Sequence, residues 1–146
     1  MGACGPERPW TVLPESEVRA LRQPCSRDFP EGLTGYWAPG KADLVDVERQ
    51  IDALVARELA AQYGDADDEQ DRLRYRRQYV GFERAGQRVI YVNAVAAGSH
   101  SWRRHTVNIC DGSVISFGAV YDPTRHRFDW FMFNGPYNGR KRPGPR

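Results

Sequence analysis

Histidine, cysteine and carboxylate side chains are the groups in this sequence that could perform chemistry. The spacing of five residues between His100 and His105 fits neither a helix face nor a familiar zinc pattern. Cys110 has a potential base in His105, but residues five apart on an extended strand point to opposite faces. The carboxylates that could form a hydrolytic pair stand where turns are expected: Asp111, Asp122 and Asp129. The sequence therefore predicts no catalytic residue, no metal ligand and no cofactor.

The segment 99–105, SHSWRRH, is the most suggestive patch for binding. Tryptophan and arginine are enriched where protein partners bind most strongly, so we interpret this segment as a loop that engages an acidic or aromatic surface. In the alternative interpretation Trp102 packs onto the edge of a sheet, and the solvated arginines keep that edge from aggregating. The residues predicted to bind a partner are His100, Trp102, Arg103, Arg104 and His105.

Three cysteines are present, and one of them, Cys4, lies close to the start of the sequence. The stretch Gly2-Ala3-Cys4 resembles the end of a bacterial lipobox, in which small residues precede the cysteine that receives diacylglycerol. The pattern also has an apolar signal segment upstream, which we expect to have been removed, with Met1 standing at the cut. The resemblance implies lipidation of Cys4. Because Gly5 is not the aspartate that retains lipoproteins at the inner membrane, it also implies the periplasmic side of the outer membrane.

The lipoprotein interpretation accounts for the odd cysteine and leaves Cys25 and Cys110 as a pair. Outside the cytoplasm we expect these two residues to form a disulfide. If the protein is cytosolic instead, Cys4 has no special role, and Cys25 and Cys110 are small buried hydrophobic residues.

Charge is unevenly placed along the 146 residues, although the net charge is only +2. The last seven residues, RKRPGPR, hold four basic residues and no acid, and the rest of the chain has 17 basic and 19 acidic residues. We expect a solvated basic tail over 140–146 and no nucleic-acid partner, because a nucleic-acid binder normally spreads basic charge over a folded face. No apolar run is long enough to span a membrane, so only the lipid would contact the membrane.

Hydrophobic periodicity predicts one long helix and several strands. Apolar residues recur every three or four positions over 42–64, which predicts an amphipathic helix with one buried stripe. A shorter helix is expected over 14–23, opened by Pro14 and ended by Pro24. Stretches rich in β-branched and aromatic residues predict strands over 74–83, 88–95, 102–110, 113–122 and 127–135. Residues 88–95 alternate two apolar faces, so we expect this strand in the middle of the sheet, covered on both sides.

This order of elements predicts an α+β fold in which one long amphipathic helix packs on a curved antiparallel sheet of four to five strands. The topology resembles the cystatin-like plan. The strand region is also similar to small uncharacterised bacterial lipoproteins, through Arg77-Gln78-Tyr79-Val80-Gly81, Ile90-Tyr91-Val92-Asn93, Cys110-Asp111-Gly112, Val120-Tyr121-Asp122 and Asn134-Gly135. We expect an N-terminal tether over 1–13, a single domain over 14–139 and the basic tail over 140–146.

Without catalytic residues, the sequence favours a non-enzymatic envelope lipoprotein that binds another macromolecule, as an inhibitor or an immunity protein would. Two alternatives stay open. One is a small-ligand-binding protein with a pocket between helix and sheet. The other is a hydrolase of unrecognised type.

Overall fold

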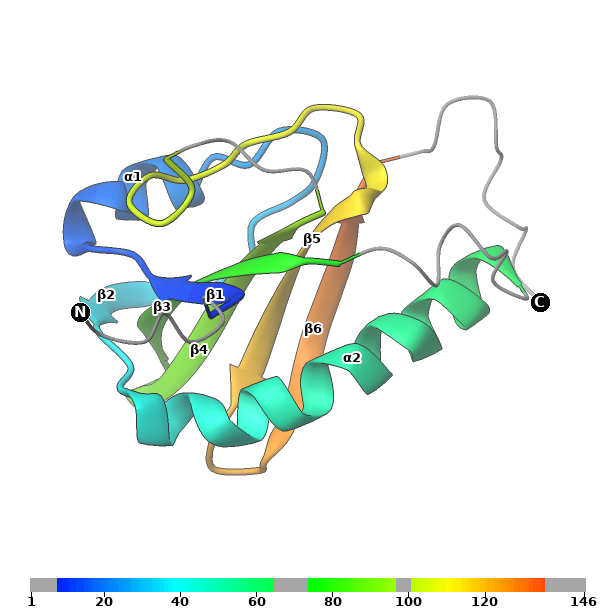
Figure 1. Cartoon of the computed structure of the whole chain (residues 1–146). Coiled ribbons are helices and arrows are strands. Elements are labelled where there is room, and N and C mark those ends of the chain that lie inside the picture. Colours follow the sequence, from blue (N-terminus) through cyan, green and yellow to red (C-terminus); the bar gives the residue numbers. More distant parts are fainter. Residues whose placement is uncertain (1–7, 65–73, 97–100, 136–146) are drawn as a thin grey trace, which may run out of the picture.

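The computed structural model describes residues 8–64, 74–96 and 101–135. The fold is α+β, with a mixed sheet in the centre and one long helix, α2 (Lys41–Tyr63), across one face. The opposite face is covered by the 3-10 turn η1 (Glu15–Glu17), the one-turn helix α1 (Val18–Leu21) and the loop 101–112 (Figure 1). The sheet is therefore covered on both sides by different parts of the chain.

Four strands form an antiparallel meander in chain order: β3 (Arg76–Arg84), β4 (Gln87–Val95), β5 (Ser113–Asp122) and β6 (Arg127–Asn134). The β3–β4 hairpin turns through Ala85 and Gly86, which both have positive φ, as the twist of a two-residue hairpin requires. Two short strands share the outer edge of β3. Strand β1 (Trp10–Val12) pairs in parallel with its first half, and β2 (Thr34–Trp37) pairs antiparallel with its second half.

Two features of the sheet correct the expectations from the sequence. The sheet is mixed, because β1 runs parallel to β3; residues 10–12 thus form a strand although we expected them in a tether. The apolar residue that follows β1, Leu13, is fully buried, which explains why this segment stays on the sheet. The strand predicted over 102–110 is wrong. These residues form a loop, and β5 pairs directly with β4.

Helix α2 agrees closely with the prediction. It begins after Gly40, whose backbone N–H donates to Asp43 Oδ2 at 2.7 Å, and it ends before Gly64. Six apolar residues form the predicted buried stripe: Leu44, Val47, Ile51, Leu54, Val55 and Leu59. The short helical segment predicted over 14–23 is also present, as η1 and α1.

The core is divided in two by the sheet. Between α2 and the sheet, the stripe of α2 packs on Tyr79, Ile90, Val92, Phe117 and other side chains that point to that face. On the opposite face, the N-terminal segment and its neighbours pack on Val80, Phe82, Val89, Tyr91 and Val120. Alternate residues of β4 thus enter different cores, which confirms that this strand is central and covered on both faces.

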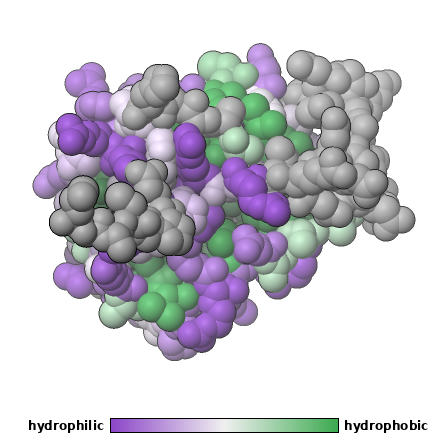
Figure 2. Space-filling view, in the orientation of Figure 1, coloured by the Kyte–Doolittle hydropathy of each residue, from purple (hydrophilic) through white to green (hydrophobic). Residues whose placement is uncertain are grey.

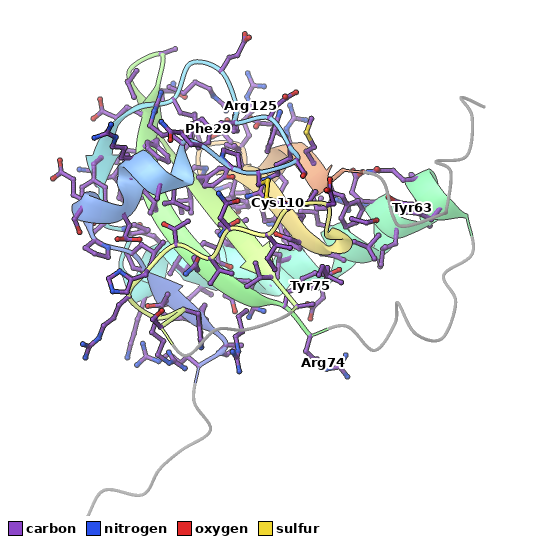
Figure 3. All side chains as sticks on the ribbon, turned by 90° about the horizontal axis from the view of Figure 1, so that it is seen from above. Phe29, Tyr63, Arg74, Tyr75, Cys110 and Arg125 are labelled. Carbon is purple, nitrogen blue, oxygen red and sulfur yellow. A yellow bond between two sulfur atoms is a disulfide. The ribbon has the colours of Figure 1, made fainter. Side chains whose placement is uncertain are left out.

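A disulfide joins Cys25 to Cys110, with their Cα atoms 4.9 Å apart. It links the segment after α1 to the end of the loop 101–112, and Figure 3 shows Cys110 on this loop above the sheet. The predicted pairing of these two cysteines is confirmed. Cys4, the acidic run after α2 and the basic tail 140–146 lie outside the described residues.

Within the described part of the chain, no helix combines the length and apolar character needed to cross a membrane. In the view of Figure 2, hydrophilic side chains predominate over the left part of the molecule, where α1, β1 and β2 lie in Figure 1.

Candidate functional site

The residues predicted to bind a partner do not share one environment. His100 lies outside the described residues. Arg104 and His105 are exposed and Arg103 is half-buried, but only 7% of Trp102 is exposed. The hypothesis of an exposed tryptophan at a loop tip is therefore wrong. Trp102 belongs to the interior of the loop and can contribute to binding only through the groups that it supports.

The Trp102 ring supports two arginine side chains. The guanidinium carbon of Arg103 lies 4.4 Å from the centre of a Trp102 ring, and that of Arg76 lies 5.3 Å away. Both distances are in the range of cation–π attraction. The tryptophan therefore holds positive charges from two separate segments, the loop and the start of β3, close together.

These side chains line a pocket of about 400 Å³, which we call the arginine pocket. It is formed by four short segments: the chain before β1, the start of β3, the end of β4 and the loop. Figure 3 shows Arg74 projecting outward beside the start of β3. Among the described residues that line the pocket none is acidic, and four are arginines, Arg8, Arg74, Arg76 and Arg103. The other described lining residues are Pro9, Tyr75, Ala96 and Trp102. The described part of the lining therefore carries positive charge and no negative charge.

Hydrogen bonds from side chains to backbone carbonyl oxygens join the N-terminal segment to the loop at this pocket. Arg103 donates from Nη2 to the carbonyl oxygen of Arg8 at 2.6 Å and from Nη1 to that of Trp10 at 3.5 Å. In return, Thr11 Oγ1 donates to the carbonyl oxygen of Arg103 at 3.0 Å. The Arg8 guanidinium lies 5.1 Å from the centre of a Trp10 ring. Strand β1 and the loop thus fix each other.

Beneath the loop, the fully buried side chain of Gln78 on β3 hydrogen-bonds to the backbone of the loop. Its Nε2 donates to the carbonyl oxygens of Trp102 at 2.6 Å and His105 at 2.7 Å. Its Oε1 accepts from the Val107 N–H at 3.0 Å and from Asn93 Nδ2 at 2.8 Å. One amide therefore satisfies backbone groups that would otherwise be unpaired when the loop covers the sheet.

Glu17 holds the exposed side of the loop. Its Oε1 accepts from the Thr106 N–H at 2.6 Å, and its Oε2 lies 3.3 Å from His105 Nδ1. The backbone hydrogen bond from Thr106 is the main cause that lowers the pKa of Glu17 below its ordinary value of 4.5. The carboxylate is therefore the form that stabilises the loop, and η1 is the element that places it.

The described residues contain no group of three or more side chains suited to hold a metal ion. His105 has Glu17 as its neighbour, and His126 has Asp46, with His126 Nδ1 3.2 Å from Asp46 Oδ2. Cys110 is in the disulfide, so it offers no thiol nucleophile to His105. The Cys110–His105 pair considered from the sequence is excluded.

A second depression, of about 860 Å³, lies beside the β3–β4 hairpin, at the other end of β3. Its cation, Arg84, is already paired with Asp129 through contacts of 3.0 and 2.5 Å. The lining mixes acids, aromatic rings and this pair: Asp28, Phe29, Pro30, Glu31, Arg84, Asp129 and Trp130. The described residues of the arginine pocket, by contrast, carry a single sign of charge, so we take this pocket as the candidate site.

Sequence reasoning missed Arg8, Arg74 and Arg76, which lie far from the loop along the chain. A signal for two of them was present, because Arg74 and Arg76 are two residues apart and share one side of an extended chain. The next residue, Arg77, points to the other face, where its Nε donates to Glu48 Oε2 at 2.6 Å. The strand pattern could thus have separated the pocket arginines from a structural one.

No protein-family model matches this chain, and neither a curated protein nor a solved structure is significantly similar to it.

Proposed function

We propose that this protein is a non-enzymatic lipoprotein of the bacterial envelope that binds an acidic surface of another macromolecule through the arginine pocket. An inhibitor or an immunity protein acts in this way, because it blocks its partner by binding and catalyses no reaction. The observation that carries the proposal is the convergence of four arginines on one pocket whose described residues include no acid. Complementary charge steers association and excludes wrong partners.

The Cys25–Cys110 disulfide supports the envelope part of the proposal. Disulfides persist in oxidising compartments such as the periplasm and are rare in the bacterial cytosol. Lipidation of Cys4 and anchoring on the periplasmic side of the outer membrane follow from the lipobox resemblance and are proposed with it. We also propose that the fold follows the cystatin-like plan, in which a helix packs on a sheet.

Affinity capture from an envelope extract tests the binding role. The bait is the folded chain. The matched baits carry charge reversals, Arg8→Glu with Arg76→Glu in one and Arg125→Glu in the other. Arg125 is an exposed arginine in the β5–β6 turn, away from the pocket (Figure 3). We expect a partner in stoichiometric amount with the parent chain and with Arg125→Glu, and its loss with the double variant. A partner that the double variant retains, or no stoichiometric partner at all, would overturn the proposal.

Mass spectrometry of the protein purified from its own membrane tests the envelope location separately. We expect the mass of a diacylglycerol on Cys4 and no free thiol at Cys25 or Cys110. An unmodified Cys4 would refute the lipid anchor while leaving the binding role to be judged by the capture experiment.

Of the two alternatives, neither is favoured by a specific observation. The space between α2 and the described part of the sheet is occupied by core side chains, among them Tyr79, Phe117 and Phe133. A hydrolase would need a nucleophile or an activated water, and the two described histidines each face one carboxylate in separate places. A small ligand has a more suitable position in the arginine pocket itself.

A further inference from the structure

The donors of Arg8 and Arg76 suggest what chemical group enters the arginine pocket. Each of these guanidiniums lies over a tryptophan ring, Arg8 over Trp10 and Arg76 over Trp102. Within the part of the chain that the structure describes, neither one has a hydrogen-bond acceptor or a carboxylate partner. A contact with a ring face uses no hydrogen-bond acceptor, so the N–H donors of each guanidinium that do not point at the ring stay available to a ligand.

The other two arginines add charge and are held differently. Arg103 is held in place by hydrogen bonds to carbonyl oxygens, and these two acceptors are uncharged. Arg74 lines the same pocket. The described lining therefore combines two cations with open donors, Arg8 and Arg76, with two further arginines, Arg74 and Arg103, that make other contacts.

An anion with several oxygens fits this arrangement better than a carboxylate does. A carboxylate has two oxygens, and the two N–H groups along one edge of a single arginine are enough to bind both. A phosphate monoester carries close to two negative charges at neutral pH and presents three strong acceptor oxygens, so it can bind two arginines at once. The pocket volume of about 400 Å³ is within the range of small-molecule sites and leaves room for the group that bears the phosphate.

The shape of the site argues for a terminal phosphate rather than a chain of phosphodiesters. Proteins that bind single-stranded nucleic acid use a groove that follows the backbone and aromatic faces on which bases stack. Here the described cations surround one pocket, and Trp102 is too buried to offer its face to a base. We propose that the arginine pocket binds a phosphate monoester group, a proposal that rests on the binding function above and specifies the acidic group of the partner.

Calorimetric titration of the whole chain tests this proposal with phenyl phosphate, phenyl sulfate, benzoate and inorganic phosphate as probes. We expect phenyl phosphate to bind at least tenfold more tightly than benzoate or phenyl sulfate, which carry the same ring and one charge. Because the second pKa of a phosphate monoester is about 6, its affinity should rise from pH 5 to pH 7.5. Arg76→Gln should weaken binding at least tenfold, Arg125→Gln should leave it unchanged, and both variants should unfold like the parent chain.

Two further arms identify the source of the phosphate. Phosphatidylcholine vesicles with and without phosphatidate present it as a lipid headgroup, and an oligonucleotide with or without a terminal phosphate presents it on a nucleic acid. Phenyl phosphate binding without phosphatidate binding indicates a soluble source, and binding of both indicates a lipid headgroup. Three results would overturn the proposal. They are equal affinity for benzoate and phenyl phosphate, unchanged phenyl phosphate affinity in Arg76→Gln, and equal binding of vesicles or oligonucleotides with and without the phosphate monoester.

The proposed function fails separately from this inference. If affinity capture finds a partner that depends on Arg8 and Arg76, but phenyl phosphate neither binds nor competes, the binding function stands and the phosphate proposal is wrong. If phenyl phosphate binds while no macromolecular partner is captured, the pocket serves a small phosphorylated ligand and the macromolecular function is wrong.

Discussion

Removal of the Cys25–Cys110 disulfide should cost a large part of the stability of this fold. The two cysteines are 85 residues apart, so the bond closes a long loop in the unfolded chain. The chain-entropy model gives a loss of about 4.5 kcal/mol at 25 °C for a loop of this length. Folded domains are typically stable by only about 5–15 kcal/mol. The double variant Cys25→Ala/Cys110→Ala should therefore still fold, with a melting temperature lower by about 10 °C or more.

Equilibrium urea unfolding measures this loss, in a Cys4→Ser background so that no other thiol exchanges with the disulfide. The parent chain and the double variant are compared with and without dithiothreitol. Since Cys110 is exposed, we expect dithiothreitol to destabilise the parent to about the level of the double variant and to leave the double variant unchanged. A difference below about 1 kcal/mol between the oxidised parent and the variant would refute the loop-closure argument.

Three other substitutions test single contacts by urea unfolding. Gly81→Ala should destabilise the fold by about 1–3 kcal/mol, because an added Cβ overlaps the ring of Trp37. The comparison is Gly86→Ala, where a Cβ meets no neighbouring atom but φ is positive. Equal losses of stability in the two variants would show that the overlap with Trp37 is not the cause. Gln78→Leu should cost about 3 kcal/mol or more, because it leaves several buried backbone groups of the loop unpaired; a loss under 1 kcal/mol would contradict this role. The pKa of Glu17 is lowered on folding, so the stability that it adds is present above its ordinary value of 4.5 and is lost as the pH falls through the lower folded value. Glu17→Gln should therefore be less stable than the parent at pH 7, and this difference should shrink as the pH falls below 4.5; a difference independent of pH would be the contrary result.

The parts of the fold that follow from local pattern were predictable. Helix α2 has a continuous stripe of apolar residues, and the hairpin after β3 has a glycine where φ must be positive. Strand β4 has apolar residues on both faces, which fixed its central place. In each case the sequence within about twenty residues contains the physical cause, either burial of one face or the conformational freedom of one residue.

The loop 101–112 was not predictable in this way. Its residues are as β-branched and aromatic as those of a strand, but what determines its structure lies outside it. Gln78 is 24 residues from Trp102 along the chain, and Glu17 is 89 residues from Thr106. Hydrogen bonds from side-chain amides and carboxylates to the backbone of the loop produce no periodic pattern in its sequence. The strand-forming residue types of the loop therefore led to a wrong prediction of a strand.

The same limit applied to the candidate site. Sequence reasoning found Trp102 and Arg103 because they are adjacent. Arg8 joins them through the parallel pairing of β1 with β3, and Arg76 through its contact with the Trp102 ring. A parallel pair forms between segments far apart in sequence, and three residues of strand give little signal of it. Residue type indicated a binding patch, but only the topology shows that it is a pocket.

The way in which the loop is held decides which substitutions can test binding. Trp102 is buried, Gln78 bonds to its carbonyl oxygen, and two arginines rest on its ring. Trp102→Ala would remove the support of those arginines and open a cavity, so a loss of binding in that variant would follow from a displaced loop as readily as from a lost contact. The guanidinium of Arg76 is exposed and contributes through its charge and its donors. Substitution of Arg76 therefore tests recognition, whereas substitution of Trp102 tests the positioning of the loop, and the two should differ in their effect on the unfolding transition.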